Sequence, residues 1–408
     1  MATHTFQFGV ELELLIGSKP PSSSSSSSKS QHKQHKSWKS LASDLSARLA
    51  QAGIPNHLNE GQDKSPANYC EWSIAREVTI PAPAGKNLCR YPLTPPFFTS
   101  LPSINRSYHR TKLTHIKQVG LELVSPAYTP TDTATGHPPW SSDLSIIFTT
   151  LHRNYVVHPS PHCSTHVHIS AQPPLSPSPY SLSPRTHPSP LLSLAKSALY
   201  YEPHLDALFP PSRSSPHSYW CQSNRSSPSL RPLPSLSHCL SYLDSCDNLV
   251  RAMCLFPARS AYGRASGHAD DFVHGGVYKW NFSGLSVPDE NGRGRGRGTL
   301  EFRQPPGSTT AEEAAAWVEL AVCFVAGAIV RGGGSLDPGA RRVGGGGGGS
   351  GSISNSSTSR MEELWWLLSA GAAQVPGFSE LRGIERLLFA ASQTGTGGKK
   401  TKTTSRKK

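Results

Sequence analysis

Hydrophobic and polar positions alternate with a period of two in several short segments between residues 6 and 303, and this alternation predicts β-strands. In residues 6–14, Phe, Val and Leu occupy the even positions, while Glu11 and Glu13 point the other way. In residues 72–80 the same period places Val78 on the packed face and Glu77 on the polar face. Further alternating segments are residues 121–123, 166–169, 278–282 and 300–303. An antiparallel sheet with one packed and one polar face accounts for all of them.

The polar faces of these predicted strands have an unusual composition. Solvated strands usually carry Thr, Ser and Lys, whereas these segments carry paired glutamates, the pair His166 and His168, and the sequence Glu301-x-Arg303. Lys279 and Asn281 alternate with aromatic residues in the same way, and Glu122 stands between two leucines. We therefore favour a charged functional cavity over an ordinary solvated sheet face.

A period near 3.6 predicts helices over residues 38–53, 141–155, 191–209, 236–253, 311–330 and 361–370. Gly53 suits the end of the first helix, and Pro210 follows the third. Residues 314–330 are strongly apolar, but this stretch is short for a membrane span and contains Glu319, so we expect a buried helix. Together with the strands, these helices predict an α+β fold without membrane contact.

Only 36% of the 408 residues are hydrophobic, and Ser, Pro and Gly are concentrated in tracts that cannot form a core. We therefore predict one folded domain over residues 1–330, with disordered inserts at about 17–37, 173–190 and 289–298. A Gly/Ser-rich linker at 331–360, a helical segment at 361–392 and a basic disordered tail at 393–408 would follow it.

The formal charge of +13 suggests a polyanionic partner, but six of the basic side chains lie in Lys399–Lys408 and three more in the Gly-Arg repeat at 293–297, segments that we expect to be accessory to the fold. No aromatic residues are interleaved with them, which favours solubilising or nuclear-targeting segments over a nucleic-acid site. The eight cysteines form no C-x-x-C pair, and the chain begins almost directly with a strand. We expect a reducing intracellular compartment, the cytoplasm or the nucleus.

Eight motifs stand in the order typical of one known family. They are Phe8-Gly-Val-Glu-Leu-Glu13, Trp72 with Glu77 and Thr79, Gly120-Leu-Glu-Leu-Val-Ser-Pro126, His162-Cys-Ser-Thr-His-Val-His168, Phe209-Pro-Pro-Ser-Arg213, Tyr262-Gly-Arg264, Lys279-Trp-Asn-Phe282 and Thr299-Leu-Glu-Phe-Arg303. With these motifs the chain resembles the putative amidoligase family, fungal type, within the glutamine-synthetase-like carboxylate–amine ligase superfamily. Glu77 and Thr79 stand where the family usually carries Asp and Ser.

The resemblance implies a glutamine-synthetase-like catalytic domain, with a curved, mainly antiparallel sheet that has a polar concave face and helices on the other face. It also implies ATP- and Mg²⁺-dependent joining of a small-molecule or peptide carboxylate to an amine through an acyl phosphate. The hard oxygen ligands and imidazoles suited to the metal are Glu11, Glu13, Glu122, His166 and Glu301. The resemblance gives cofactor-binding roles to Lys279, Asn281 and His168. It gives catalytic roles to Arg303, Arg213 and Arg264, whose planar guanidinium groups can donate two hydrogen bonds to a phosphate or a substrate carboxylate. The chain has neither a Walker A loop nor a dinucleotide-binding glycine motif, so metal and cations would have to hold the nucleotide.

Other readings stay open at this point. Glu11 and Glu13 could form a solvated strand face, and Arg213 could cap the helix before it. The carboxylates and histidines could bind zinc or manganese in a metal-dependent hydrolase. The chain could also be an inactive ligase-fold binding protein whose basic segments contact nucleic acid, although the intact acidic residues speak against this.

Overall fold

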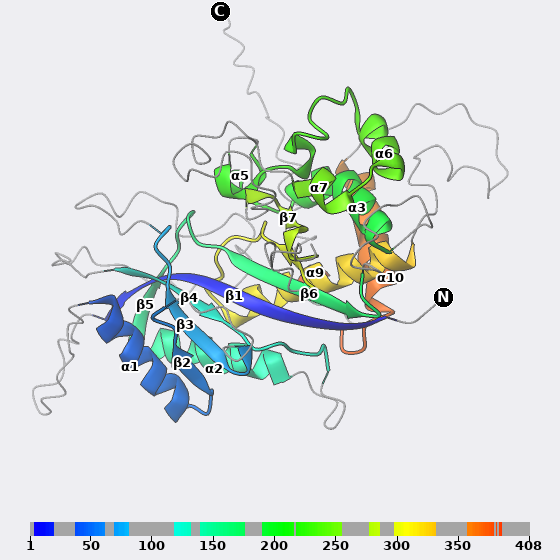
Figure 1. The fold of residues 1–408 in the computed structure, drawn as a ribbon. Coiled ribbons are helices and arrows are strands. Elements are labelled where there is room, and N and C mark those ends of the chain that lie inside the picture. Colours follow the sequence, from blue (N-terminus) through cyan, green and yellow to red (C-terminus); the bar gives the residue numbers. More distant parts are fainter. Residues whose placement is uncertain are drawn as a thin grey trace, which may run out of the picture.

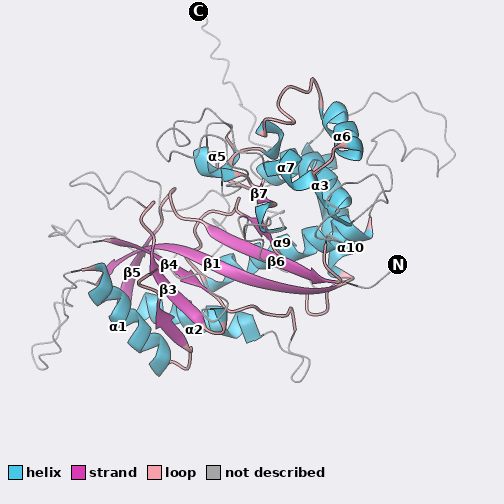
Figure 2. Cartoon of the chain, viewed as in Figure 1, coloured by secondary structure: helices cyan, strands magenta, loops and turns pink. Residues whose placement is uncertain are grey.

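A computed structural model of the chain describes residues 4–19, 37–61, 69–80, 118–131, 139–175, 190–215, 218–254, 277–285, 298–331, 357–378, 381 and 383–385. These residues form one eight-stranded sheet with several helices (Figures 1 and 2). The predicted Tyr262-Gly-Arg264 motif, the basic tail and most of the predicted inserts lie outside the described residues.

The strands are β1 (Thr5–Ser18), β2 (Asn56–Leu58), β3 (Trp72–Arg76), β4 (Val119–Val124), β5 (Tyr155–His158), β6 (Thr165–Gln172), β7 (Trp280–Asn281) and β8 (Leu300–Phe302). Their order in the sheet is β2-β3-β4-β1-β6-β8-β7, and β5 pairs with the last part of β1. Among the strands of the described residues, only β2 and β3 pair in parallel. The prediction of an α+β fold with a mainly antiparallel sheet is thus confirmed.

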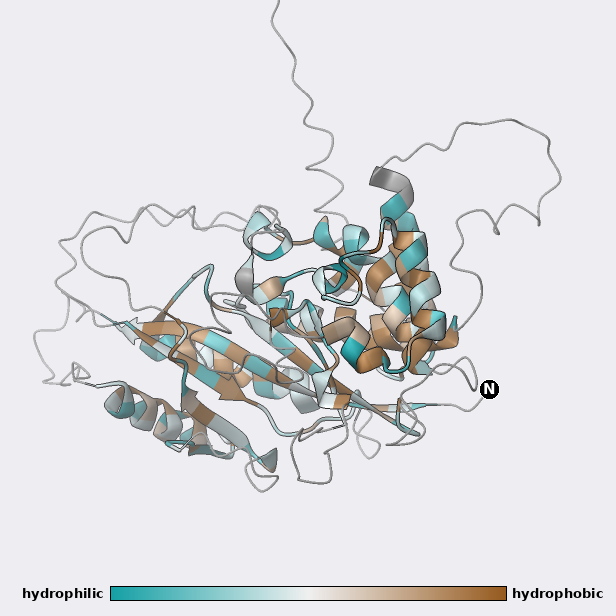
Figure 3. Ribbon diagram, turned by 45° about the horizontal axis from the view of Figure 1, so that its top comes forward, coloured by the Kyte–Doolittle hydropathy of each residue, from teal (hydrophilic) through white to brown (hydrophobic). Residues whose placement is uncertain are grey.

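Strand β1 lies at the centre of the sheet and fixes the register of its neighbours. Its even-numbered residues from Phe6 to Ile16 are all buried, as the alternation predicted. On the opposite face Glu13 lies across from Glu122 of β4, and Glu11 lies across from His166 of β6. Figure 3 shows hydrophobic and hydrophilic residues alternating along the long strands. A slip of one residue would move every carboxylate into the core, so the apolar pattern also sets the site.

Three long helices cover the apolar face: α1 (Trp38–Gln51), α2 (Pro139–Asn154) and α9 (Ala311–Val330). Their buried leucines and aromatic rings join the even-numbered residues of β1 in one core. Helix α1 begins at the N-cap Ser37, whose side chain accepts a hydrogen bond from Ser40 N, and Gly53 follows it with a positive φ of 88°. Among the described residues, one helix, α9, is long and apolar enough to cross a membrane. In its most apolar 18-residue stretch 72% is buried, which is typical of a core helix.

The remaining helices gather around α9 and the β7 edge (Figure 1). They are α3 (Pro190–Tyr200), α4 (Glu202–Asp206), α5 (Pro211–Ser214), α6 (Leu236–Ser245), α7 (Leu249–Cys254) and α10 (Ser357–Ala372), with short 3₁₀ turns at Tyr219–Cys221, Asn224–Ser226 and Ser283–Leu285.

Helix α10 and the segment after it pack into the same core as the sheet. The backbones of α9 and α10 touch at two glycines, because a Cβ on Gly371 would lie 1.9 Å from Cys323 O and one on Gly327 would lie 2.2 Å from Leu367 O. Further on, the ring of Phe378 packs edge-on against Trp140, with centroids 5.6 Å apart, and 6.4 Å from the ring of Phe8. The segment 357–378 therefore completes the packing of the first strand.

Several predicted boundaries were wrong. The helix expected over 191–209 breaks at Tyr201, because Pro203 cannot continue a helix and instead starts α4. The helix expected over 236–253 breaks before Asn248, whose side chain accepts a hydrogen bond from Arg251 N at the start of α7. Strands β2 and β5 were not predicted.

The largest error concerns the strand expected over 72–80. Strand β3 ends at Arg76, and Val78 is 65% exposed instead of packed. After the strand, Glu77 N donates to Gly120 O at 3.1 Å, and the chain bends until Ile80 reaches a small cluster with Leu15. The period of two therefore stops before Glu77.

Glu319 gives the fold a dependence on pH. It lies on α9, and its Oε2 accepts hydrogen bonds from Gly383 N at 3.2 Å and Ile384 N at 3.3 Å. Burial raises the pKa of Glu319 from 4.5 to about 7. Between these two values the folded chain binds more protons than the unfolded chain, so stability falls as pH rises through this window.

We expect Glu319→Gln to flatten the pH dependence of the free energy of unfolding between about pH 4.5 and 7. It should add about 2 to 3 kcal/mol at pH 8, since one pKa unit corresponds to about 1.4 kcal/mol. Urea titrations at several pH values measure this, with the exposed Glu312→Gln on the same helix as the control. Equal pH slopes in wild type and Glu319→Gln would contradict the prediction.

Candidate functional site

The polar face of the sheet brings together residues from five strands or their ends. Glu11 and Glu13 come from β1, His166 and His168 from β6, Glu122 from β4, Glu301 from β8 and Asn281 from β7. The register aligns them in a continuous row, because His168 lies across from Glu301 and Asn281 lies across from Glu301 on the other side. The alternation predicted that each of these seven residues lies on a polar strand face, and the register makes them neighbours although they are scattered over 290 positions of sequence.

The first group in this row, here called the histidine cluster, consists of Glu11, His166, His168 and Glu301. The Glu11 carboxylate contacts both rings, at 3.0 Å from His168 Nε2 and 3.1 Å from His166 Nδ1. Glu301 Oε1 lies 3.4 Å from His166 Nδ1 and 3.8 Å from His168 Nε2. One ligand atom each of Glu11, His168 and Glu301 lie within 4.8 Å of one another, a spacing that could hold a metal ion.

The second group, here called the carboxylate cluster, consists of Glu13, Glu77 and Glu122. One oxygen of each lies within 4.8 Å of the others. Glu77 reaches the group because its backbone packs directly on β4, where a Cβ on Gly120 would lie 2.6 Å from Glu77 O. The motif comparison had drawn attention to Glu77, but it was absent from the predicted metal ligands. Its proximity to Glu13 depends on the bend after β3, which the alternation could not indicate.

His166 connects the two groups. Its ring is buried, with Nδ1 toward Glu11 and Nε2 3.7 Å from Glu13 Oε1. This Nε2 atom is buried and makes no hydrogen bond within the described part of the chain. A buried imidazole nitrogen beside a carboxylate is a ready ligand position for a cation.

The electrostatics of the row differ from one carboxylate to the next. Burial raises the pKa of Glu13, and His166 and Arg303 only partly oppose it. Burial also acts on Glu11, but His168 and His166 outweigh it and hold the pKa of that carboxyl well below its usual range. Burial likewise opposes ionisation of Glu301, yet Arg303 and the two imidazoles lower its pKa. The three carboxylates of Glu13, Glu77 and Glu122 lie close enough to repel one another when ionised, and a divalent cation would relieve this repulsion.

The donor sets therefore fit hard divalent cations. Such ions take several oxygen ligands, and the carboxylate cluster offers oxygens alone, while the histidine cluster adds imidazole. The sheet holds each donor on a strand or directly beside one, so the cluster geometry is supported by the register of β1.

Arg303 follows β8 and is the cation nearest to these acids. Its Nη1 donates to Glu301 Oε1. Burial lowers its pKa, but Glu301, Glu13 and Glu11 outweigh that and raise it, so the guanidinium stays charged. Its Nε is buried and has no hydrogen-bond partner among the described residues. One N–H of this guanidinium is thus available to an anionic ligand.

Three other predicted residues make contacts of a different kind. Asn281 Nδ2 donates to Glu301 Oε2 at 2.7 Å and so orients that carboxylate. Arg213, on α5, is buried and donates through Nε to Gln304 O at 3.0 Å and through Nη2 to Arg303 O. Lys279 is 2% exposed, and its Nζ lies 3.2 Å from Glu202 Oε1 and 2.6 Å from Asp206 Oδ1. Arg264 lies outside the described residues.

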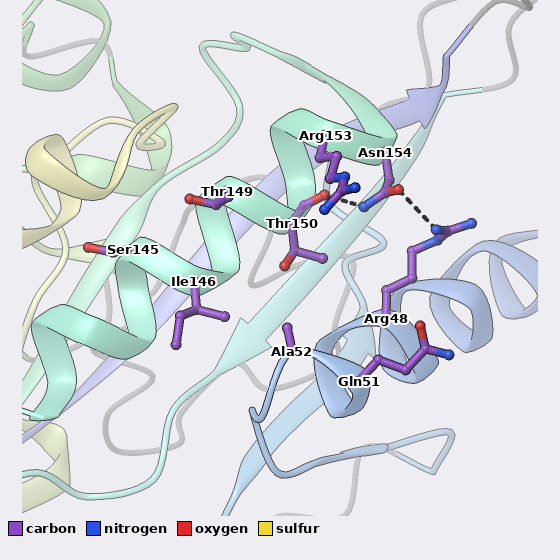
Figure 4. Close-up of a pocket in the computed structure, with 9 residues that line it drawn as sticks. All are labelled: Arg48, Gln51, Ala52, Ser145, Ile146, Thr149, Thr150, Arg153 and Asn154. Carbon is purple, nitrogen blue, oxygen red and sulfur yellow. Dashed lines mark hydrogen bonds between the residues drawn. The ribbon is translucent and has the colours of Figure 1, made fainter.

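A pocket of about 740 Å³ opens between α1 and α2. Figure 4 shows Arg48 bonded to Asn154, and Asn154 bonded to the backbone of Thr150. These helices cover the apolar face, so the pocket lies on the side of the sheet away from the carboxylates. None of the predicted site residues lines it, and we place the functional site on the polar face.

Comparison with known proteins identifies one family. A family model described as putative amidoligase enzyme matches residues 4–325, more than three quarters of the chain. The match includes all residues of both clusters and ends before α10. No curated protein and no solved structure matches the chain.

Proposed function

The chain belongs to the putative amidoligase enzyme family, and we propose that it joins a carboxylate to an amine at the expense of ATP, with Mg²⁺, through an acyl phosphate. The observation that carries this proposal is the pair of acidic clusters side by side on one sheet face, bridged by His166 and flanked by Arg303. We further propose a glutamine-synthetase-like arrangement of the domain.

In this proposal one Mg²⁺ would be held by Glu11, His168 and Glu301, and another by Glu13, Glu77 and Glu122. The buried Nε2 of His166 lies beside the second group, 3.7 Å from Glu13 Oε1. When bound, the ions would neutralise the negative charge of the nucleotide phosphates during phosphoryl transfer. Asn281 fixes the orientation of Glu301 by a hydrogen bond of 2.7 Å.

Arg303 has the second role. Its guanidinium is charged, close to both clusters, and carries a buried N–H without a hydrogen-bond partner in the described chain. We propose that this N–H donates to an oxygen of the transferred phosphoryl group or of the substrate carboxylate. A donor already fixed by Glu301 needs little reorganisation when charge develops.

The proposed reaction has two steps. A substrate carboxylate oxygen forms a bond to the γ-phosphorus of ATP, and the bond to ADP breaks. The amine nitrogen then bonds to the acyl carbon, inorganic phosphate leaves and the amine loses a proton. The substrates would be a small-molecule or peptide carboxylate and an amine.

Hydroxylamine trapping tests this proposal. The purified chain is incubated with Mg²⁺–ATP, hydroxylamine and panels of carboxylates, and hydroxamate and ADP are measured together. Hydroxamate formed in step with ADP, and only when a carboxylate is present, is the expected result. If the rate of ADP release were the same with and without a carboxylate in every panel, the ligase proposal would be overturned. Carboxamide hydrolysis without ATP but with zinc or manganese would favour the metal-dependent hydrolase.

A further inference from the structure

Asp206, at the end of α4, was not among the predicted site residues. A single carboxylate oxygen, Oδ1, accepts hydrogen bonds from Lys279 Nζ and from Gln304 Nε2, both at 2.6 Å. Glu202 lies four residues earlier on the same helix face and contacts the same ammonium at 3.2 Å. Helix α4 therefore holds one residue next to each strand of the antiparallel β7–β8 pair, Lys279 before β7 and Gln304 after β8, at the same end of the pair.

Lys279 and Gln304 adjoin the residues of the histidine cluster. Lys279 directly precedes β7, and Gln304 follows Arg303 after β8. Arg303 N donates to Lys279 O at 2.9 Å, so the two segments are also joined through their backbones. Gln304 is fully buried. Any shift of α4 would therefore be passed to the peptide that carries Arg303.

Arg213 holds that peptide from the other side. Its guanidinium donates to the carbonyl oxygens of both Arg303 and Gln304, and Gln304 Nε2 lies 3.4 Å from Arg213 O. The backbone N–H and C=O of Arg303 and the C=O of Gln304 thus all make hydrogen bonds. Among the described residues, this peptide is held by side chains from two helices as well as by its own sheet.

We propose that Asp206 is a positioning residue: together with Lys279, Gln304 and Arg213 it fixes the backbone of Arg303, and through it the guanidinium that contacts Glu301. The catalytic consequence rests on the function proposed above. Lys279 and Arg213 act in this network through other residues, with their donors directed at protein carboxylates and carbonyls.

The network of Asp206, Lys279, Gln304 and Arg213 is better explained by a role in positioning Arg303 than by a contribution to the free energy of unfolding. A buried ion pair seldom adds net stability over apolar side chains of similar volume, because desolvating the charges offsets their attraction. The Lys279 side chain is 2% exposed and meets two carboxylates at 10% and 26% exposure. Such a network does, however, hold groups in one arrangement, and a misplacement of about 1 Å near a reacting group can cost about 100-fold in rate.

Three variants test the proposal. Asp206→Ala removes the shared acceptor. Asp206→Asn keeps an oxygen at the same place and should restore much of the positioning. Asp143→Asn is the control, because that half-buried carboxylate accepts the Tyr128 hydroxyl on the apolar side of the sheet. Amide hydrogen exchange is measured on each cation-free chain well below its melting temperature, with resolution at residues 300–304 and at 144–151 of α2.

For Asp206→Ala we expect faster exchange at the Arg303 amide, unchanged exchange in α2, and a kcat about 10- to 100-fold lower. Asp206→Asn should lie between Asp206→Ala and wild type in both measurements, and Asp143→Asn should change neither. Unchanged exchange at Arg303 in Asp206→Ala overturns the proposal, and so does an equal loss of kcat in Asp143→Asn.

The two proposals fail in different ways. If the wild-type chain releases no ADP with any carboxylate, the proposed function fails, while the exchange comparison on the cation-free chain still decides whether Asp206 positions Arg303. If the wild type is active but Arg303 exchanges at the same rate in all variants, the function stands and the positioning role is lost.

Discussion

Replacing both Glu11 and Glu13 with glutamine will remove the rise in melting temperature that Mg²⁺–ATP gives the wild-type chain. It will also lower carboxylate-dependent ADP release by at least about 10³-fold. Each glutamate belongs to a different cluster, so the double variant weakens both proposed cation sites at once. Glutamine has nearly the same shape but carries no charge and offers one carbonyl oxygen in place of a carboxylate. Thermal unfolding with and without Mg²⁺–ATP, followed by the ADP assay, measures both effects.

The same pair of substitutions distinguishes loss of binding from loss of folding. Without cations, Glu13 lies in a group of three close carboxylates, and burial opposes its ionisation. Glu13→Gln alone should therefore melt at or above the wild-type temperature in the absence of cations, whereas Glu11→Gln loses the interactions with His168 and His166 that lower the pKa of Glu11. Glu60→Gln combined with Glu312→Gln, two exposed glutamates, is the matched control and should keep the full response to Mg²⁺–ATP. A response retained in Glu11→Gln/Glu13→Gln would place the cations elsewhere.

Gly371→Ala will destabilise the fold by at least about 3 kcal/mol, a large part of the ~5 to 15 kcal/mol typical of a domain. The added Cβ would lie 1.9 Å from Cys323 O and 2.8 Å from its carbonyl carbon, which are backbone atoms of α9 and cannot move away as a side chain would. Without this contact the substitution would be favourable, because alanine stabilises a helix interior by about 1 kcal/mol over glycine. Urea unfolding measures the loss.

Gly61→Ala is the control for this substitution, since its Cβ would meet no atom within 4 Å. It should change the free energy of unfolding by less than about 0.5 kcal/mol. If Gly371→Ala were as stable as Gly61→Ala, the close crossing of α9 and α10 would be wrong. Because α10 lies beyond the region matched by the family model, this result also tells whether the segment belongs to the folded domain in solution.

The part of the site that the sequence predicted is the part that strand geometry controls. Glu11 and Glu13 were expected on one face because β-strands alternate strictly, and the apolar residues between them leave one register. His166 and Glu301 followed from the same rule applied to other strands. Which strands are neighbours was not predictable from alternation, and the shared ordering of the family motifs supplied only the expectation that they meet.

The residues that sequence reasoning missed or placed less well depend on turns and short helices. Glu77 joins Glu13 only because the chain bends after Arg76. Lys279 was grouped with Asn281 by its place in the alternation, but its partners Glu202 and Asp206 lie on a five-residue helix whose direction is set by packing. The break that creates this helix lies at Pro203, which the sequence analysis did not use; a proline is accepted in the first turn of a helix but not in its interior.

The contact between Phe8 and Phe378 has a consequence for how the chain is made. Strand β1 leaves the ribosome before the other strands of the sheet and lies at its centre. The ring of Phe8 meets Tyr128 and Trp140 earlier in synthesis, but Phe378 is added only after some 370 further residues. Contacts of such wide separation close slowly, and the apolar side of an early strand stays accessible to other chains in the meantime. Nascent chains that stop short of Phe378 should therefore be held by chaperones, and release should coincide with synthesis of the segment after α10.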